Sequence, residues 1–287
     1  MELFPHLDEK SPKATNAERK NSKIITGDSR HELARLEQGI VQCCITSPPY
    51  WGLRDYGVEG QIGAEMDLDD YISDLVSIFS EVRRVLADDG TLWLNIGDSY
   101  TSGGRTWRDS DKKNPARGMK YRAPTPHGLK PKDLIGVPWK IAFALQADGW
   151  YLRSDIIWSK NNALPESVKD RPSRIHEYVF LLSKSERYFY NHEAVKELGV
   201  NGKKRNCRSV WSINTEPCKE AHFATFPRDL VKRCLLAGSQ ADSLVLDPFF
   251  GAGTVGEVCQ IYDRQFLGIE LNPEYVEIAK RKLKWVD

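Results

Sequence analysis

Long apolar runs, paired cysteines and a secretory leader are all missing from this sequence. No apolar stretch approaches the roughly 18 residues that a membrane-spanning helix needs, and residues 1–22 are polar where a signal peptide would be apolar. The six cysteines form no CxxC pair and have no histidine at zinc-finger spacing, so neither a metal site nor a disulfide framework is expected. We therefore predict a cytoplasmic protein with reduced thiols, no membrane segment and a polar N-terminal arm over residues 1–22.

The net charge of +1 conceals a segregation of charge along the chain. Residues 59–89 hold nine acidic side chains against two arginines, whereas residues 101–133 hold nine Lys or Arg against three aspartates. Residues 201–208 add four basic side chains and no acid. Such runs are either solvated loops or a basic face for nucleic acid. In the second interpretation the candidate DNA-binding residues are Arg105, Arg108, Lys112, Lys113, Arg117, Arg122, Lys203, Lys204 and Arg205.

The order of apolar periodicities predicts an α/β fold. Short apolar segments indicate strands, and apolar residues spaced by three and four indicate helices between them. This alternation is typical of a doubly wound, mostly parallel sheet. We expect strands at 23–28, 41–45, 91–96, 151–158, 177–183, 243–247 and 265–270, a turn at 88–90, and helices at 31–36, 68–86, 138–147, 226–236, 253–262 and from Pro273 onward.

A turn from Asp247 to Thr254 joins a predicted strand to a predicted helix. It contains a GxGxxG pattern that starts at Gly251, whose glycines allow a ligand to approach the backbone next to the unpaired N–H groups of a helix start. Glu270 ends the next strand, where a carboxylate can accept hydrogen bonds from ribose hydroxyls. Nicotinamide and flavin enzymes carry the same glycines. However, Asp247 and Pro248 stand where a pyrophosphate would need backbone donors, so a phosphate-free cation such as S-adenosylmethionine fits better.

A second motif, Thr46-Ser47-Pro48-Pro49-Tyr50, directly follows a buried strand. Two consecutive prolines fix φ twice and remove two backbone donors, which leaves a stiff loop. An enzyme that methylates an exocyclic amine must accept the amine protons, so that the nitrogen lone pair leaves conjugation with the ring. The Ser47 hydroxyl and the Pro48 carbonyl can each accept one N–H, while the Tyr50 ring stacks on an extruded base. The predicted catalytic residues are Ser47, Pro48, Pro49 and Tyr50.

With both motifs in this order, the chain resembles the beta-class DNA amino-methyltransferases of restriction-modification systems and phages. In that family a (D/N/S)PP(Y/F/W) loop precedes a DPFxGxGT cofactor turn, as Ser47–Tyr50 precedes Asp247–Thr254 here. The resemblance spans roughly residues 23–285. It implies a circularly permuted, Rossmann-like class I methyltransferase fold with S-adenosyl-L-methionine as cofactor. It further implies one catalytic domain over 23–287, with DNA-contacting insertions at about 99–133 and 184–210.

The resemblance also assigns individual cofactor residues. Asp28 is similar to the acid that contacts the adenine, and the 222–227 segment is similar to the one that closes over the methionine end. The stretches 156–160 and 174–177 are similar to segments of which some line the target-base pocket. The implied cofactor-binding residues are Asp28, Phe223, Thr225, Asp247, Pro248, Phe249, Gly251, Gly253, Thr254, Glu270 and Asn272.

Serine at the first loop position is typical of N4-cytosine enzymes in this family, whereas N6-adenine enzymes mostly carry aspartate. We therefore expect methylation of the N4 of a flipped cytosine in double-stranded DNA, with N6-adenine as the alternative. Cys218 after Pro217 leaves a C5-cytosine interpretation open, and a nicotinamide-dependent oxidoreductase and a non-catalytic DNA-binding module are rival classes. A homodimer and a cognate restriction endonuclease are further partners that the resemblance suggests.

Overall fold

The computed structural model describes residues 22–101, 123–163, 165–216 and 226–285. None of the helices in these ranges combines the length and the apolar character needed to cross a membrane. The elements follow one another as β1 (Lys23–Thr26), α1 (Ser29–Ala34), β2 (Val41–Thr46), α2 (Leu68–Val85), β3 (Leu86–Ile96), α3 (Val137–Ala147), β4 (Tyr151–Ser159), β5 (His176–Ser183), β6 (Glu197–Leu198), β7 (Lys204–Arg205), β8 (Val210–Ser212), α4 (Arg228–Gly238), β9 (Leu244–Asp247), α5 (Thr254–Ile261), β10 (Gln265–Glu270) and α6 (Pro273–Lys282).

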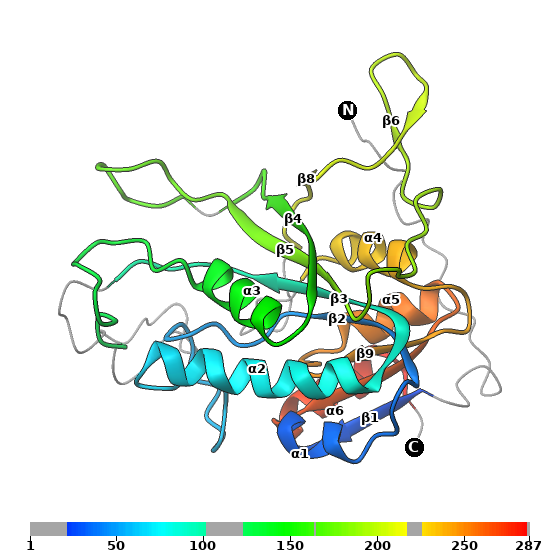
Figure 1. Ribbon diagram of the computed structural model, residues 1–287, viewed down its shortest axis with the longest axis horizontal. Helices are drawn as coiled ribbons and strands as arrows, with labels where there is room; N and C mark the ends of the chain where they lie inside the picture. Colours follow the sequence, from blue (N-terminus) through cyan, green and yellow to red (C-terminus); the bar gives the residue numbers. More distant parts are fainter. Residues whose placement is uncertain (1–21, 102–122, 164, 217–225, 286–287) are drawn as a thin grey trace.

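One mixed sheet forms the centre of the molecule (Figure 1). Its strand order is β1-β10-β9-β2-β3-β5-β4-β8. Every neighbouring pair is parallel except the two that involve β5, which runs against both β3 and β4. The predicted mostly parallel α/β sheet is therefore confirmed. Of the strands in the described residues, the last two along the chain, β9 and β10, lie between the first two, β1 and β2.

Helices cover both faces of this sheet. Apolar side chains of α1, α2 and α3 belong to one buried cluster, and those of α4, α5 and α6 belong to a second. The strands supply the two clusters alternately: on β3, Leu92 and Leu94 point to the first cluster, while Trp93 points to the second. This period of two is what a strand buried on both faces requires. The predicted doubly wound arrangement is thus confirmed.

Three details differ from the sequence-based expectation. The predicted turn at 88–90 lies inside β3, which already begins at Leu86, because the pairing with β2 jumps from Val41↔Leu86 to Cys43↔Thr91 and the extra residues form an irregularity. The short strand β8 pairs with β4 and was not predicted, since three residues carry no periodicity. The second basic run, residues 201–208, includes the turn and the second strand of a two-stranded hairpin, β6–β7, for which no strands were predicted.

Phe250 attaches the glycine turn to β10. Its side chain is buried and stacks on Phe266 with ring centroids 5.6 Å apart, and its backbone N–H donates to the Ile269 carbonyl at 2.9 Å. A Cβ atom at Gly268 would lie 2.3 Å from Cγ of Phe250. Only glycine leaves room for this ring over the strand, so Gly268 is a packing requirement of the turn.

Replacing Gly268 by alanine should therefore destabilise the fold. We expect Gly268→Ala to lower the free energy of unfolding by about 1–3 kcal/mol, because the new methyl group overpacks the space held by Phe250. Urea denaturation measures this change. In a Phe250→Leu background the same substitution should cost much less, since the two residues are in contact. Strictly additive costs would contradict this account of the turn.

Candidate functional site

A pocket opens at the carboxyl ends of β1, β2, β9 and β10, the edge at which open α/β sheets bind ligands. Residues from both sequence motifs line it, although the motifs lie far apart in the chain. Eight of the predicted cofactor residues face it together with two of the predicted catalytic ones: Asp28, Asp247, Pro248, Phe249, Gly251, Thr254, Glu270 and Asn272, with Ser47 and Pro49.

Gly251 and Gly253 shape the turn between β9 and α5. Both adopt positive φ, 51° and 77°, which glycine accepts without strain. Gly253 is the residue before the first turn of α5, and a Cβ atom there would lie 3.0 Å from Cβ of Ala279. Gly251 lines the pocket, whereas Gly253 lets α6 pack closely against the turn.

Asp247 is the buried acid at the end of β9. Its Oδ1 accepts hydrogen bonds from Thr46 Oγ1 at 2.7 Å and from the Phe249 N–H at 3.0 Å, and the residue is only 3% exposed. Burial raises the pKa of Asp247 to about 7, although both hydrogen bonds oppose this shift. A carboxyl group in this state gains from a cationic ligand, which would restore its charge.

Glu270 closes the pocket from β10. Its Oε2 accepts from the Gly251 N–H at 2.7 Å and its Oε1 from the Asn272 N–H at 2.8 Å. Burial raises the pKa of Glu270, while these backbone donors favour the ionised form. Each oxygen keeps lone-pair capacity for a ligand hydroxyl. Asn272 itself caps α6, because its Oδ1 accepts from the Glu274 N–H at 2.9 Å.

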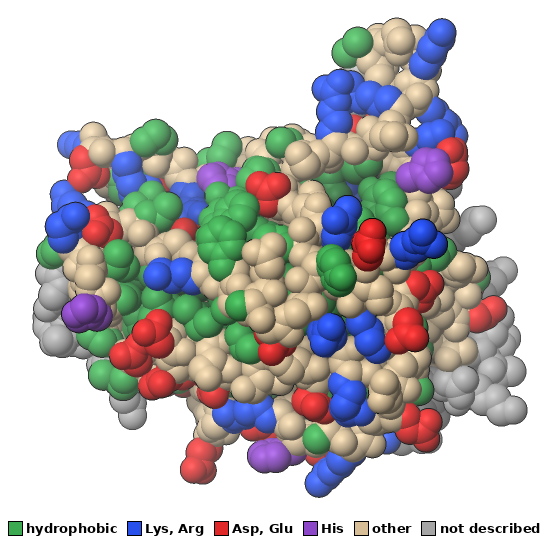
Figure 2. All heavy atoms as spheres, in the orientation of Figure 1, with side chains coloured by type: hydrophobic (Ala, Val, Ile, Leu, Met, Phe, Trp, Pro, Cys, Tyr) green, Lys and Arg blue, Asp and Glu red, His purple; other side chains and the backbone are tan. Residues whose placement is uncertain are grey.

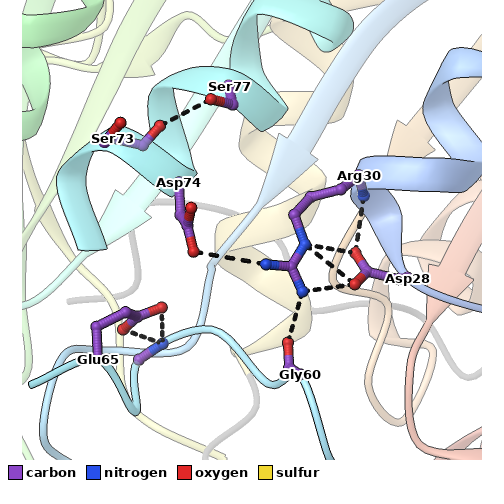
Figure 3. A network of polar contacts seen from close by, with 8 residues as sticks. Asp28, Arg30, Gly60, Glu65, Ser73, Asp74 and Ser77 are labelled. Carbon is purple, nitrogen blue, oxygen red and sulfur yellow. Dashed lines mark hydrogen bonds and ion pairs between the residues drawn. The ribbon is translucent and has the colours of Figure 1, made fainter. Parts of the chain in front are cut away.

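Asp28 lies in a polar network at the start of α1 (Figure 3). Its two carboxylate oxygens accept from the Arg30 guanidinium at 2.6–3.0 Å, and Oδ1 also caps the helix by accepting from the Arg30 N–H. Burial would raise the pKa of Asp28, but Arg30 outweighs burial and lowers it. Arg30 also donates to the Gly60 carbonyl at 2.8 Å and pairs with Asp74 at 3.5 Å. Asp28 therefore lines the pocket as part of an ion pair.

The loop after the proline motif supplies pocket residues that sequence reasoning missed. Tyr56, Val58, Gln61 and Ile62 line the pocket. Gln61 holds the loop together by accepting from the Tyr56 N–H at 2.7 Å and donating to the Arg54 carbonyl at 3.1 Å. Segments with neither periodicity nor a known motif offer no signal that distinguishes such residues from an ordinary loop.

The proline loop lies beside this pocket. Ser47 and Pro49 line it, Pro48 is buried, and the Pro49 carbonyl accepts from the Tyr71 hydroxyl at 2.8 Å. Tyr50 lies so close to Gly97 that a Cβ atom there would be 2.7 Å from Cε2 of its ring. The Tyr50 hydroxyl donates to Glu177 Oε2 at 2.8 Å, and burial raises the pKa of Tyr50 well above its usual value.

The second basic run projects from the body as the β6–β7 hairpin (Figure 1), and Figure 2 shows Lys and Arg side chains gathered on it. Lys203 and Lys204 are exposed. Arg205 is half-buried and lies 3.6 Å from Glu197, a buried acid that also faces Arg233 of α4 at 3.4 Å. Arg205 thus belongs to the base of the hairpin, whereas the two lysines face solvent.

Several predicted residues lie outside the described ranges. These are Phe223 and Thr225 of the cofactor set, Cys218, and the basic residues Arg105, Arg108, Lys112, Lys113, Arg117 and Arg122. The cysteines within the described ranges are free thiols. No group of three or more His, Cys, Asp or Glu within the described ranges could hold a metal ion.

The chain matches the family model described as DNA methylase over residues 41–281. It is 60% identical over 285 residues to the Type II methyltransferase M.SmaI of Serratia marcescens, covering 99% of this chain and 96% of that protein. It is 59% identical over 279 residues to M.Cfr9I of Citrobacter freundii, covering 97% and 93%.

Solved structures show the same fold at lower identity. The PvuII DNA methyltransferase (cytosine-N4-specific) superposes with a TM-score of 0.69 and 20% identity, covering 93% of this chain and 87% of that one. A putative DNA modification methylase from Thermus thermophilus, complexed with S-adenosyl-L-methionine, superposes with a TM-score of 0.64 and 24% identity, covering 91% and 93%. The predicted methyltransferase fold is confirmed, and the chain belongs to the N6/N4 family of DNA methylases.

Proposed function

We propose that this DNA methyltransferase transfers a methyl group from S-adenosyl-L-methionine to the exocyclic N4 of a cytosine that has been flipped out of duplex DNA. Membership of the N6/N4 family and the Type II relatives make it a DNA methyltransferase of the restriction-modification kind. The choice of cytosine N4 rests on Ser47, a neutral hydroxyl at the edge of the pocket where an aspartate would be typical of adenine enzymes. A cytosine-N4-specific enzyme has the same fold.

The residues of the pocket fit S-adenosyl-L-methionine. Glu270 keeps acceptor capacity for the ribose hydroxyls, and the Asp247 carboxyl suits the ammonium group. Apolar side chains of Val58, Ile62 and Phe249 line the same pocket and offer surface for an adenine ring. When bound, the cofactor supplies a sulfonium methyl group. Ser47 lies on the wall of this pocket, so that an amine held by its hydroxyl would face the cofactor.

The base target is tested directly by product analysis. Wild-type protein incubated with labelled S-adenosyl-L-methionine and mixed-sequence duplex DNA should produce labelled N4-methylcytosine, identified by nucleoside mass spectrometry. Ser47→Ala should lower this yield strongly, because one acceptor for the amine protons is lost, while cofactor binding is retained. N6-Methyladenine as the sole product would overturn the cytosine assignment. Labelled 5-methylcytosine would overturn amino methylation altogether.

Cofactor affinity should depend on pH through Asp247. Its pKa of about 7 in the free protein means that below pH 7 the carboxyl is increasingly protonated and must lose a proton to face a cation. The dissociation constant should therefore rise as pH falls, by about tenfold between pH 7.5 and pH 6 if the cation fully restores ionisation. Calorimetric titration without DNA measures it. Asp247→Asn should bind the cofactor more weakly, and its dissociation constant should not change over this pH range. A constant value in this variant would assign the pH dependence to Asp247 and not to Glu270. An equal wild-type affinity at both pH values would refute this role.

We further propose that the β6–β7 hairpin contacts the phosphates of DNA through Lys203 and Lys204. Both are exposed on an element that projects from the body, and a two-stranded ribbon fits the major groove. A hairpin anchored by buried Glu197 can hold such contacts in place. The basic residues between 102 and 122 remain predicted DNA contacts.

Removing both lysines should weaken DNA binding on all sequences. For Lys203→Ala with Lys204→Ala we expect the slope of log K against log salt to decrease in magnitude by about 2, since each phosphate contact contributes about 0.9. Fluorescence anisotropy over a salt series measures the slope. The matched control, Arg35→Ala with Arg281→Ala, removes two exposed positive charges, one directly after α1 and one on α6, and should leave the slope unchanged. An unaltered slope in the lysine variant would exclude the hairpin from the interface.

A further inference from the structure

Four polar side chains outside the cofactor pocket form a continuous hydrogen-bonded chain behind Ser47. Ser47 Oγ lies 3.4 Å from the Tyr50 hydroxyl, and that hydroxyl lies 2.8 Å from Glu177 Oε2. Asn95 Nδ2 donates to the same Glu177 oxygen at 3.2 Å, and Lys160 Nζ donates to Glu177 Oε1. The 3.4 Å contact is long, as catalytic hydrogen bonds often are before the substrate is bound.

The position of Glu177 follows from the antiparallel direction of β5. It is the second residue of that strand, so it lies at the edge of the sheet where the parallel strands end, with Asn95 near the end of β3 and Lys160 directly after β4. The side chains of Lys160 and Glu177 are each 18% exposed. The Lys160 ammonium also lies 4.3 Å from the centroid of the Trp158 ring. A carboxylate with these partners is held in one orientation.

The direction of the hydrogen bonds is fixed by the carboxylate. An ionised carboxylate can only accept, so the single proton of the Tyr50 hydroxyl must point to Glu177. The Tyr50 hydroxyl also lies 3.5 Å from Asn95 Oδ1, a second acceptor, but the 2.8 Å contact with Glu177 is much the shorter of the two and takes the proton. The Tyr50 oxygen is then available only as an acceptor, and Ser47 must donate to it. The lone pairs of Ser47 Oγ consequently remain for the amine of the target base.

We propose that Glu177 is a positioning residue that, acting through Tyr50, keeps Ser47 as a hydrogen-bond acceptor toward the target amine, and that the same chain removes the proton which methyl transfer releases. This inference rests on the proposed function. It adds Glu177, with Lys160 as its counter-ion, to the residues that serve the reaction. Nothing in the Ser-Pro-Pro-Tyr motif alone points to either of them.

The proton released by methyl transfer has a defined path to Glu177. The N4 lone pair forms the new N–C bond while the S–C bond breaks and its electron pair stays on sulfur, so the amine nitrogen becomes positively charged and must lose one proton. That proton passes to Ser47 Oγ as the Ser47 proton moves to Tyr50 and the Tyr50 proton moves to Glu177 Oε2. The carboxylate becomes a neutral carboxyl group beside Lys160, and exchange with solvent restores it.

A double-mutant cycle tests the chain. Tyr50→Phe keeps an aromatic ring for stacking but breaks the relay in the middle, and Glu177→Gln replaces the carboxylate at its end. Each substitution should lower the single-turnover rate of methyl transfer by about 10²-fold. The double variant should be about as slow as either single variant, because both act through one path. The dissociation constant for S-adenosyl-L-methionine and the KM for DNA should stay within about twofold of wild type.

The controls separate this inference from the proposed function and from misfolding. Glu81→Gln, which removes a half-buried carboxylate paired with Arg84 on α2, far from the chain of hydrogen bonds in sequence, should leave the rate unchanged. Tyr50→Phe retains the Lys160–Glu177 pair and keeps the test open if Glu177→Gln does not fold. Rates equal to wild type in both single variants, or effects that multiply to about 10⁴-fold in the double variant, would overturn the relay. A wild-type protein that forms no N4-methylcytosine would instead overturn the proposed function.

Discussion

The hydrogen bond from Thr46 Oγ1 to Asp247 Oδ1 joins two motifs that are 201 residues apart. It is possible because β2 and β9 are adjacent and parallel, with Cys43 opposite Val245 and Cys44 opposite Leu246, so both strands deliver their motifs at the same edge. The distance between the proline loop and the glycine turn is thus set by backbone pairing and one buried bond. Under the proposed function the glycine turn holds the methyl donor and the proline loop holds the acceptor, and methyl transfer needs the two in line and in contact, which this fixed distance favours.

Three carboxyl groups around the pocket are stabilised in three ways. Asp28 is an ion pair with Arg30, Glu270 is held by backbone N–H groups, and Asp247 is buried with only two hydrogen bonds to Oδ1 among the described residues. The pKa of each acid depends on how well its ionised form is stabilised. It is lowered for Asp28, raised for Glu270, and raised to about 7 for Asp247. The acid with the weakest support has the most to gain from a cation.

Much of this architecture could be predicted from the sequence, because strong periodicities and two motifs mark the elements that carry it. The β2 and β9 strands and their loops were predicted at nearly their observed positions. The contacts that could not be predicted are those that depend on tertiary structure. Nothing in the sequence shows that Arg30 forms an ion pair with Asp28, that Asn272 caps a helix, or that the loop around Tyr56 lines the pocket. The strand β8 and the irregularity in β3 were missed because pairing, not local pattern, defines them.

The strand order has a consequence for how the protein is made. On the ribosome β1 and β2 are synthesised before β3 to β8, yet the strands that lie between them in the sheet, β9 and β10, are synthesised after β8. A nascent chain that has reached β8 therefore has no partner for β1 and leaves one edge of β2 unpaired, and open edges of this kind invite association with other chains. Pairings as distant as Lys23 with Leu267 also make folding slow. The pocket at the carboxyl ends of these strands is completed only when β9 and β10 have joined the sheet, so a chain that ends before β9 lacks the walls that Asp247 and Glu270 provide.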